Sequence, residues 1–165
     1  MSGQSEQAGG RRGQRLEVGA VVEDFTLPDE QGQPTSLSGL LAAGPVVLFF
    51  YPAALTPGCT AEACHFRDLA AEFAGAGAQP VGISSDGVAR QQEFADRHSL
   101  GFPLLSDPEG VVRERFGVAR GLALLPTKRA TFVIDVQRRV VEVVRSEFRM
   151  SAHADRALTA VRALG

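Results

Sequence analysis

The sequence predicts an α/β fold in which helices pack against one mixed β-sheet. Three observations predict it. A continuous apolar run at residues 46–51 reads as a strand that is buried on both faces. Strand-like and helix-like patterns then alternate as far as residue 116. The chain continues with two strands joined by a tight turn and a last helix, so the predicted sheet is mixed rather than wholly parallel.

Length and composition favour one compact domain. The chain has 165 residues, of which 44% are hydrophobic, and we expect residues 16–165 to form a single domain. Residues 1–15 are mostly Gly, Ser, Gln and Arg, which predicts a disordered tail without the apolar stretch of a signal peptide. The net charge of −2 offers no basic field for nucleic acid or a membrane, and no apolar run reaches the roughly 18 residues of a membrane helix. We therefore expect a cytoplasmic protein with neither partner.

The first strand leads into the longest predicted helix. Pro52 and a short loop follow the strand, and Thr56 and Pro57 then form a start signal, with Thr as the N-cap and Pro at the first helical position. We expect this helix to extend to about residue 74, where Gly75 ends it. Its apolar stripe consists of Phe66, Leu69, Ala70 and Phe73.

The remaining elements continue the alternation. Four further strands are predicted at residues 80–84, 102–105, 131–134 and 140–144. Three further helices are predicted at residues 88–98, 108–116 and 152–164. The last two strands form a hairpin around residues 136–138. This order of elements is that of a thioredoxin-like sandwich.

Cys59, one of two cysteines, stands at the beginning of the long helix. Unpaired backbone N–H groups and the positive end of the helix dipole meet there, and such a position favours the nucleophilic thiolate. The amides of Gly58 and Cys59 could also receive a negatively charged oxygen. The other interpretation is a small buried apolar side chain, and the position alone leaves both open.

Cys64 lies five residues further along the same predicted helix. Five residues turn the helix by about 140° and separate the two Cα atoms by about 8.6 Å. A disulfide needs Cα atoms within about 7 Å, so the two cysteines cannot bond while the helix is intact. A redox pair is compatible with this spacing only if the first turns of the helix unwind.

The segment at residues 51–68, with the sequence YPAALTPGCTAEACHFRD, resembles the active-site segment of the peroxiredoxins. Pro52, Thr56 and Cys59 match the peroxiredoxin pattern P-x-x-x-T-x-x-C. A second Cys five residues on, followed by Phe-Arg-Asp, resembles the bacterioferritin comigratory protein group, also called peroxiredoxin Q. Further matches are the segments GISSD at 82–86, FPLLSD at 102–107 and RATFVID at 129–135. The resemblance extends from about residue 16 to the C-terminus.

The resemblance implies a thiol peroxidase of antioxidant defence that reduces hydrogen peroxide and organic hydroperoxides. Cys59 would attack the peroxide and become a sulfenic acid, and Cys64 would resolve it as a disulfide within one subunit. A thioredoxin-like or low-molecular-weight thiol would then reduce the disulfide. No organic cofactor or metal is implied, and the group suggests a monomer, with a weak dimer as the alternative.

The same resemblance assigns roles to four further residues. Thr56 would hydrogen-bond the thiolate and the peroxide, and Pro52 would shield the pocket from water. Arg129 would stabilise the thiolate and the developing alkoxide, and Glu62 would orient Arg129. Each also has a purely structural interpretation: Thr56 as an N-cap, Pro52 as a strand end, Arg129 as an ordinary surface arginine and Glu62 as a partner of the helix dipole.

Two other classes of function remain as alternatives. A general disulfide oxidoreductase uses C-x-x-C, and the wider cysteine spacing here argues against it. A non-catalytic thioredoxin-like binding or chaperone module would use the apolar segment 121–126 as its contact surface, although we favour packing of this segment on the core. The cysteines and histidines lack metal-ligand spacing, and we expect surface positions for His65, His98 and His153.

One departure from the family pattern bears on the substrate. Residues 53–55 are Ala-Ala-Leu, where the group usually carries polar or charged side chains. We expect an apolar pocket rim that prefers bulky organic or lipid hydroperoxides over hydrogen peroxide.

Overall fold

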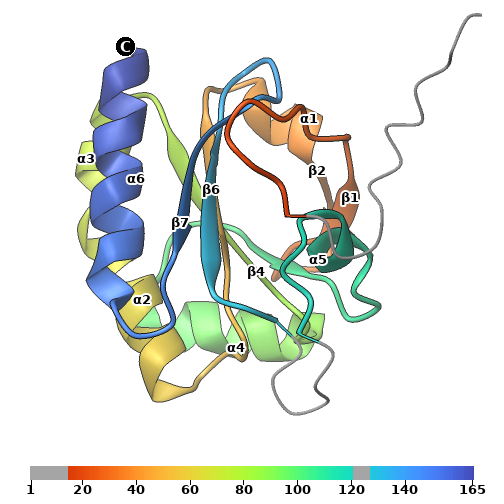
Figure 1. The fold of residues 1–165 in the computed structure, drawn as a ribbon. Coiled ribbons are helices and arrows are strands. Elements are labelled where there is room, and N and C mark those ends of the chain that lie inside the picture. The colour runs from red at the N-terminus through yellow and green to blue at the C-terminus, as the bar shows by residue number, and fades with distance from the viewer. Residues whose placement is uncertain (1–14, 121–126) are drawn as a thin grey trace, which may run out of the picture.

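The structure, a computed structural model, describes residues 15–120 and 127–165. Its centre is a five-stranded sheet in the order β5-β4-β3-β6-β7 (Figure 1). The strands are β3 (Val46–Phe50), β4 (Gln79–Ser84), β5 (Leu104–Ser106), β6 (Ala130–Ile134) and β7 (Val140–Arg145). β3, β4 and β5 are parallel, whereas β6 is antiparallel to both β3 and β7. The predicted mixed sheet and thioredoxin-like fold are confirmed.

Helices cover both faces of this sheet (Figure 1). They are α1 (Leu37–Leu41), α2 (Pro57–Asp68), α3 (Ala70–Gly75), α4 (Val88–His98), α5 (Val111–Arg115) and α6 (Met150–Leu164). α2, α3, α4 and α6 contribute to the apolar cluster on one face. On the other face, α1 and α5 pack together with a two-stranded sheet of β1 (Thr26–Pro28) and β2 (Pro34–Ser36).

The central strand β3 explains why the apolar run is continuous. Successive side chains of a strand point to opposite faces of a sheet. Val47 and Phe49 therefore pack toward α2, and Leu48 and Phe50 pack toward α5. The ring of Phe49 stacks on that of Phe66 from α2, with 4.3 Å between ring centroids. This stacking anchors α2 to the sheet.

The structure differs from the sequence-based prediction in several places. The long predicted helix is two helices, because Leu69 leaves the helical conformation between α2 and α3. The apolar stripe continues across this break, so the hydrophobic pattern does not reveal it. β1, β2 and α1 were not predicted, since they have three to five residues and two of them contain proline. α5 is shorter than predicted, and α6 begins two residues earlier.

Two predictions concern segments that the structure does not describe. These are the N-terminal tail, apart from Arg15, and the apolar segment 121–126. Across the ranges 15–120 and 127–165, none of the helices has the length and apolar character needed to cross a membrane.

Candidate active site

The site forms where the end of β3 meets the beginning of β6. The two strands are antiparallel, with Phe50 opposite Ala130. This register places Arg129, the residue before β6, beside the turn that leads from β3 into α2. Cys59, the third residue of α2, is reached by the Arg129 side chain although the two residues are 70 positions apart in the chain.

Arg129 connects two groups on α2. Its Nη2 donates to Cys59 Sγ at 3.4 Å, and its Nη1 donates to Glu62 Oε1 at 2.7 Å. Cys59 is 1% exposed, Glu62 is fully buried and Arg129 is 7% exposed. Burial opposes the charge on Arg129, but the negative charges of Glu62 and Cys59 outweigh it and raise the pKa of the guanidinium. Arg129 is therefore a fixed positive charge beside the thiol.

Glu62 is held in an apolar environment. Burial raises its pKa to about 8, even though Arg129 acts to lower it. Its second oxygen, Oε2, is buried and accepts no hydrogen bond from the described residues. His153 Nδ1 lies 3.5 Å from this oxygen.

The prediction that His153 lies on the surface is wrong. The side chain is fully buried between α6 and the sheet. Its Nδ1 lies 2.8 Å from Thr131 Oγ1, and its Nε2 lies 2.7 Å from the carbonyl oxygen of Ser146. The spacing of His153, Ala157 and Val161 would have located it, because residues four apart share one face of a helix and all three are buried. His65 and His98 are half-buried, and His65 Nε2 lies 2.7 Å from Asp155 Oδ1.

Thr56 and Pro52 lie in the loop between β3 and α2. Thr56 occupies the N-cap position, as predicted, but its hydroxyl donates to the carbonyl oxygen of Ala53 at 2.7 Å rather than capping the helix. Pro52 is half-buried directly after the fully buried Tyr51. The loop is tied to the sheet because the Ala54 N–H donates to Asp86 Oδ2 at 2.7 Å. Asp86 is a contact that sequence reasoning did not single out.

Cys64 stands apart from this group. It is half-buried and its thiol is free, as is that of Cys59. Both cysteines belong to the unbroken helix α2, in which the spacing of five residues keeps their Cα atoms too far apart for a disulfide. Within the described residues, no three His, Cys, Asp or Glu side chains gather in a way that could hold a metal ion.

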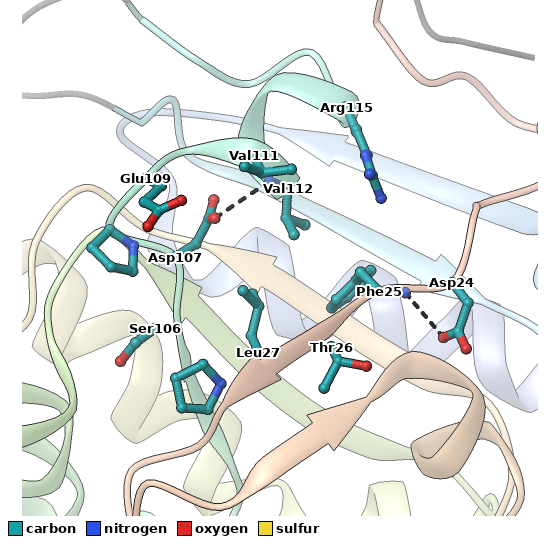
Figure 2. Close-up of a pocket in the computed structure, with 12 residues that line it drawn as sticks. Asp24, Phe25, Thr26, Leu27, Ser106, Asp107, Glu109, Val111, Val112 and Arg115 are labelled. Atoms are coloured by element: carbon teal, nitrogen blue, oxygen red, sulfur yellow. Dashed lines mark hydrogen bonds between the residues drawn. The ribbon is translucent and has the colours of Figure 1, made fainter.

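A cavity of about 660 Å³ lies elsewhere, between β1 and α5 (Figure 2). Phe25, Leu27 and Val112 line it together with the carboxylates of Asp24, Asp107 and Glu109. Asp107 Oδ1 accepts from the N–H of Val112 and so supports the beginning of α5. None of the predicted site residues lines this cavity, and Phe25 and Val112 belong to the apolar cluster on the face opposite Cys59.

Comparison with known proteins identifies the family. The chain matches the AhpC/TSA family over residues 18–143. A Mycobacterium tuberculosis protein named as a peroxiredoxin is 58% identical over 151 residues, which cover 90% of this chain and 98% of that protein. The chloroplast peroxiredoxin Q of Sedum lineare is 41% identical over 150 residues, covering 91% of this chain and 80% of that protein. The chain belongs to the peroxiredoxins.

Solved structures agree with this assignment. The crystal structure of peroxidoxin BcpB from Mycobacterium tuberculosis superimposes with a TM-score of 0.89 at 57% identity, covering 92% of this chain and 99% of that chain. The bacterioferritin comigratory protein of Xanthomonas campestris, described for its alkyl peroxide reduction, gives 0.77 at 31% identity, covering 85% and 91%. The predicted membership of the bacterioferritin comigratory protein group is confirmed. This peroxiredoxin is a thiol peroxidase, with a hydroperoxide as substrate and a thiol as reductant.

Proposed function

We propose that this peroxiredoxin reduces hydrogen peroxide and organic hydroperoxides with Cys59 as the attacking thiolate and Cys64 as the resolving thiol of the same subunit. The observation that carries the proposal is the guanidinium of Arg129, which contacts Cys59 Sγ and Glu62 at once. A buried positive charge at this place favours the thiolate over the thiol. It also lies beside the oxygen on which negative charge develops.

In the first step, the Cys59 thiolate attacks one peroxide oxygen. The S–O bond forms while the O–O bond breaks, so sulfur is oxidised to a sulfenic acid and the peroxide is reduced to an alcohol or water. Arg129 stabilises the departing oxygen until it takes up a proton. Pro52 keeps water from the thiolate, and the Thr56 hydroxyl turns from Ala53 to the peroxide.

In the second step, the Cys64 thiolate attacks the Cys59 sulfur. An S–S bond forms while the S–O bond of the sulfenic acid breaks, and the departing hydroxide takes a proton from solvent to become water. This step requires the first turns of α2 to unwind, since the intact helix keeps the two cysteines too far apart. An external dithiol of the thioredoxin type, or a low-molecular-weight thiol, then exchanges with the disulfide and restores both thiols.

The apolar loop between β3 and α2 supports a preference for organic hydroperoxides. Ala53 and Leu55 are half-buried, whereas Ala54 is fully buried and belongs to the core rather than to a rim. Met150 lies on the other side of the site, where its Cε would be 3.5 Å from a Cβ placed on Gly58. Equal second-order rates with cumene hydroperoxide and hydrogen peroxide would contradict this preference.

We further propose that the protein is a cytoplasmic monomer and that residues 16–165 form one domain.

A single-turnover experiment tests the mechanism. Reduced protein is mixed with one equivalent of hydrogen peroxide, and peroxide loss and intact mass are followed together. In the wild type, we expect rapid loss of peroxide and a mass decrease of about 2 Da, as a disulfide forms. In Cys64→Ser, we expect a mass gain of about 16 Da from a Cys59 sulfenic acid, which a sulfenate reagent traps. Cys59→Ser should consume almost no peroxide. If Cys59→Ser and wild type consume it equally slowly, the proposal fails and a binding module becomes the better explanation.

A further inference from the structure

Glu62, Arg129 and His153 form a buried group whose charges must balance. Glu62 and His153 are fully buried, and Arg129 is almost so. The groups facing Glu62 are Arg129 from the position before β6, His153 from α6 and Glu147 from the segment after β7. Cys59, also on α2, contacts the same guanidinium. An uncompensated charge in such an apolar environment is strongly destabilising. With Cys59 as a thiolate, an ionised Glu62 would leave two negative charges against the single positive charge of Arg129.

The hydrogen bonds of His153 establish where its protons are. Nε2 lies 2.7 Å from the carbonyl oxygen of Ser146, which only accepts, so Nε2 carries a hydrogen. Burial lowers the pKa of His153, which favours the neutral ring. In this neutral ring Nδ1 carries a lone pair and no hydrogen, and the hydroxyl of Thr131 donates to Nδ1 at 2.8 Å.

This lone pair faces Glu62 Oε2, the oxygen that has no hydrogen-bond partner among residues 15–120 and 127–165. Nδ1 and Oε2 are 3.5 Å apart, and two acceptors at this distance repel each other unless one of them carries a proton. A proton on Oε2 removes this repulsion, because the carboxyl then donates toward the ring and shares the Nδ1 lone pair with the Thr131 hydroxyl. Oε1 still accepts from Arg129 Nη1 in this state.

We propose that Glu62 and His153 together hold one proton at neutral pH and that this proton lies on the Glu62 carboxyl. Because Glu62 is then neutral, the positive charge of Arg129 is available to stabilise the Cys59 thiolate and the departing oxygen. The pair then has no net charge, and the thiolate and the guanidinium compensate each other. Loss of the proton would turn Glu62 into a competitor of Cys59 for Arg129. His153 is thus a positioning residue that acts through Glu62. The proposal rests on the proposed roles of Cys59 and Arg129.

A double-mutant cycle tests the proposal by its pH dependence. Single-turnover peroxide consumption is measured from about pH 5 to pH 10, a range that brackets the pKa of a buried carboxyl, for wild type, Glu62→Gln, His153→Leu and the double variant. We expect the wild-type rate to fall as pH rises through about 8. Glu62→Gln carries an amide that cannot ionise, so its rate, taken relative to its own value at pH 7, should lose the alkaline fall.

His153→Leu removes the acceptor of the shared proton. We expect the pKa of Glu62 to fall by about one unit, so that the alkaline fall begins about one pH unit lower. The rate should then drop about twofold at pH 7 and about tenfold at pH 9 or above. In the Glu62→Gln background the same substitution should cost almost nothing, because an amide has no proton to lose. A His153→Leu loss of equal size in both backgrounds would mean that His153 only packs, and it would overturn the proposal. His98→Leu, on α4, is the matched control and should leave the pH profile unchanged.

Nuclear magnetic resonance gives a readout that does not depend on turnover. We expect the Glu62 carboxyl carbon to titrate above neutral pH, and His153 to show an unprotonated Nδ1 at neutral pH. Titration of Glu62 near its ordinary value of 4.5 would overturn the proposal. If neither the wild type nor any of these variants, all of which retain Cys59, consumes peroxide rapidly, the proposed function fails. The spectra still show whether the proton lies on Glu62.

Discussion

Arg129 is the residue that joins the groups of the site. Its planar guanidinium presents donors in a fixed fork, so that one side chain contacts Cys59 and Glu62 at the same time. A lysine has the same charge but cannot reproduce this fork.

Arg129→Lys should therefore lower the rate of peroxide consumption about a hundredfold, the typical cost of one lost donor to a developing oxyanion. Single-turnover kinetics with hydrogen peroxide would measure it. Arg97→Lys is the control, because Arg97 is exposed on α4 and pairs only with Glu93 among the described residues. Equal rates for the two variants would show that the fork is dispensable.

Glu62 also links stability to pH. Its pKa is about 8 in the folded protein against an ordinary 4.5, so the folded state binds more protons between these values. Its contribution to stability is complete below pH 4.5 and is lost as the pH rises toward 8, at up to about 1.4 kcal/mol per pH unit. We expect Glu62→Gln to remove this slope in urea unfolding measured at several pH values. Parallel pH dependences for the two proteins would contradict the prediction.

His153 acts in the opposite direction. Burial lowers its pKa below 6.5, so the folded state binds fewer protons than the unfolded state in acid. Its contribution is present above pH 6.5 and is lost as the pH falls below it. The two slopes are separable, because each disappears in a different variant, Glu62→Gln or His153→Leu.

At the scale of elements, the proposed mechanism makes the stability of α2 decide between two fates of the Cys59 sulfenic acid, resolution by Cys64 and over-oxidation. Opening the helix between Cys59 and Cys64 withdraws Glu62 and Ala63 from a core in which both are fully buried. While the helix stays closed, the sulfenic acid cannot meet Cys64 and a second peroxide can oxidise it to sulfinic acid.

Ala61→Gly tests this balance, because Ala61 is an exposed position between the two cysteines. Glycine in a helix costs about 1 kcal/mol relative to alanine, so opening should become about fivefold more favourable. We expect disulfide to form faster and less sulfinic acid to accumulate under excess peroxide, as measured by intact mass. Ala89→Gly places the same change on an exposed position of α4 and should have no effect. An equal change in both variants would show that the opening of α2 does not control over-oxidation.

The elements also show how far sequence reasoning reaches. α4 was predicted from a helical period and β3 from a continuous apolar run, and each pattern extends over several residues. The break at Leu69 was missed because the apolar stripe passes through it, and β1 and β2 because they are short. The motif predicts Cys59, Glu62 and Arg129, and the structure brings these three together. Their contacts depend on the register of β3 and β6, which no local pattern contains. His153 was wrongly placed because a polar residue in a buried stripe reads as surface.

At the scale of the whole molecule, two phenylalanines mark the contrast between core and surface. Phe49 contacts the rings of Phe66, Phe102 and Tyr51, and it is fully buried. Phe49→Ala should lower the free energy of unfolding by about 3–5 kcal/mol. Phe148 is 92% exposed, and Phe148→Ala should change the free energy of unfolding by less than about 0.5 kcal/mol. Chemical denaturation measures both, and a large loss for Phe148→Ala would place this side chain in an interface between subunits.

The pairing of β3 with β6 has a consequence for protein synthesis. Cys59 leaves the ribosome 70 residues before Arg129, and the guanidinium reaches the sulfur only after β6 has paired with β3. A contact between residues so distant in sequence requires a long loop to be closed, and such pairings form slowly. On the proposed mechanism, the nascent Cys59 thiol lacks its cationic partner until β6 has paired with β3, and we expect it to become reactive toward peroxide only when the sheet next to Arg129 is complete.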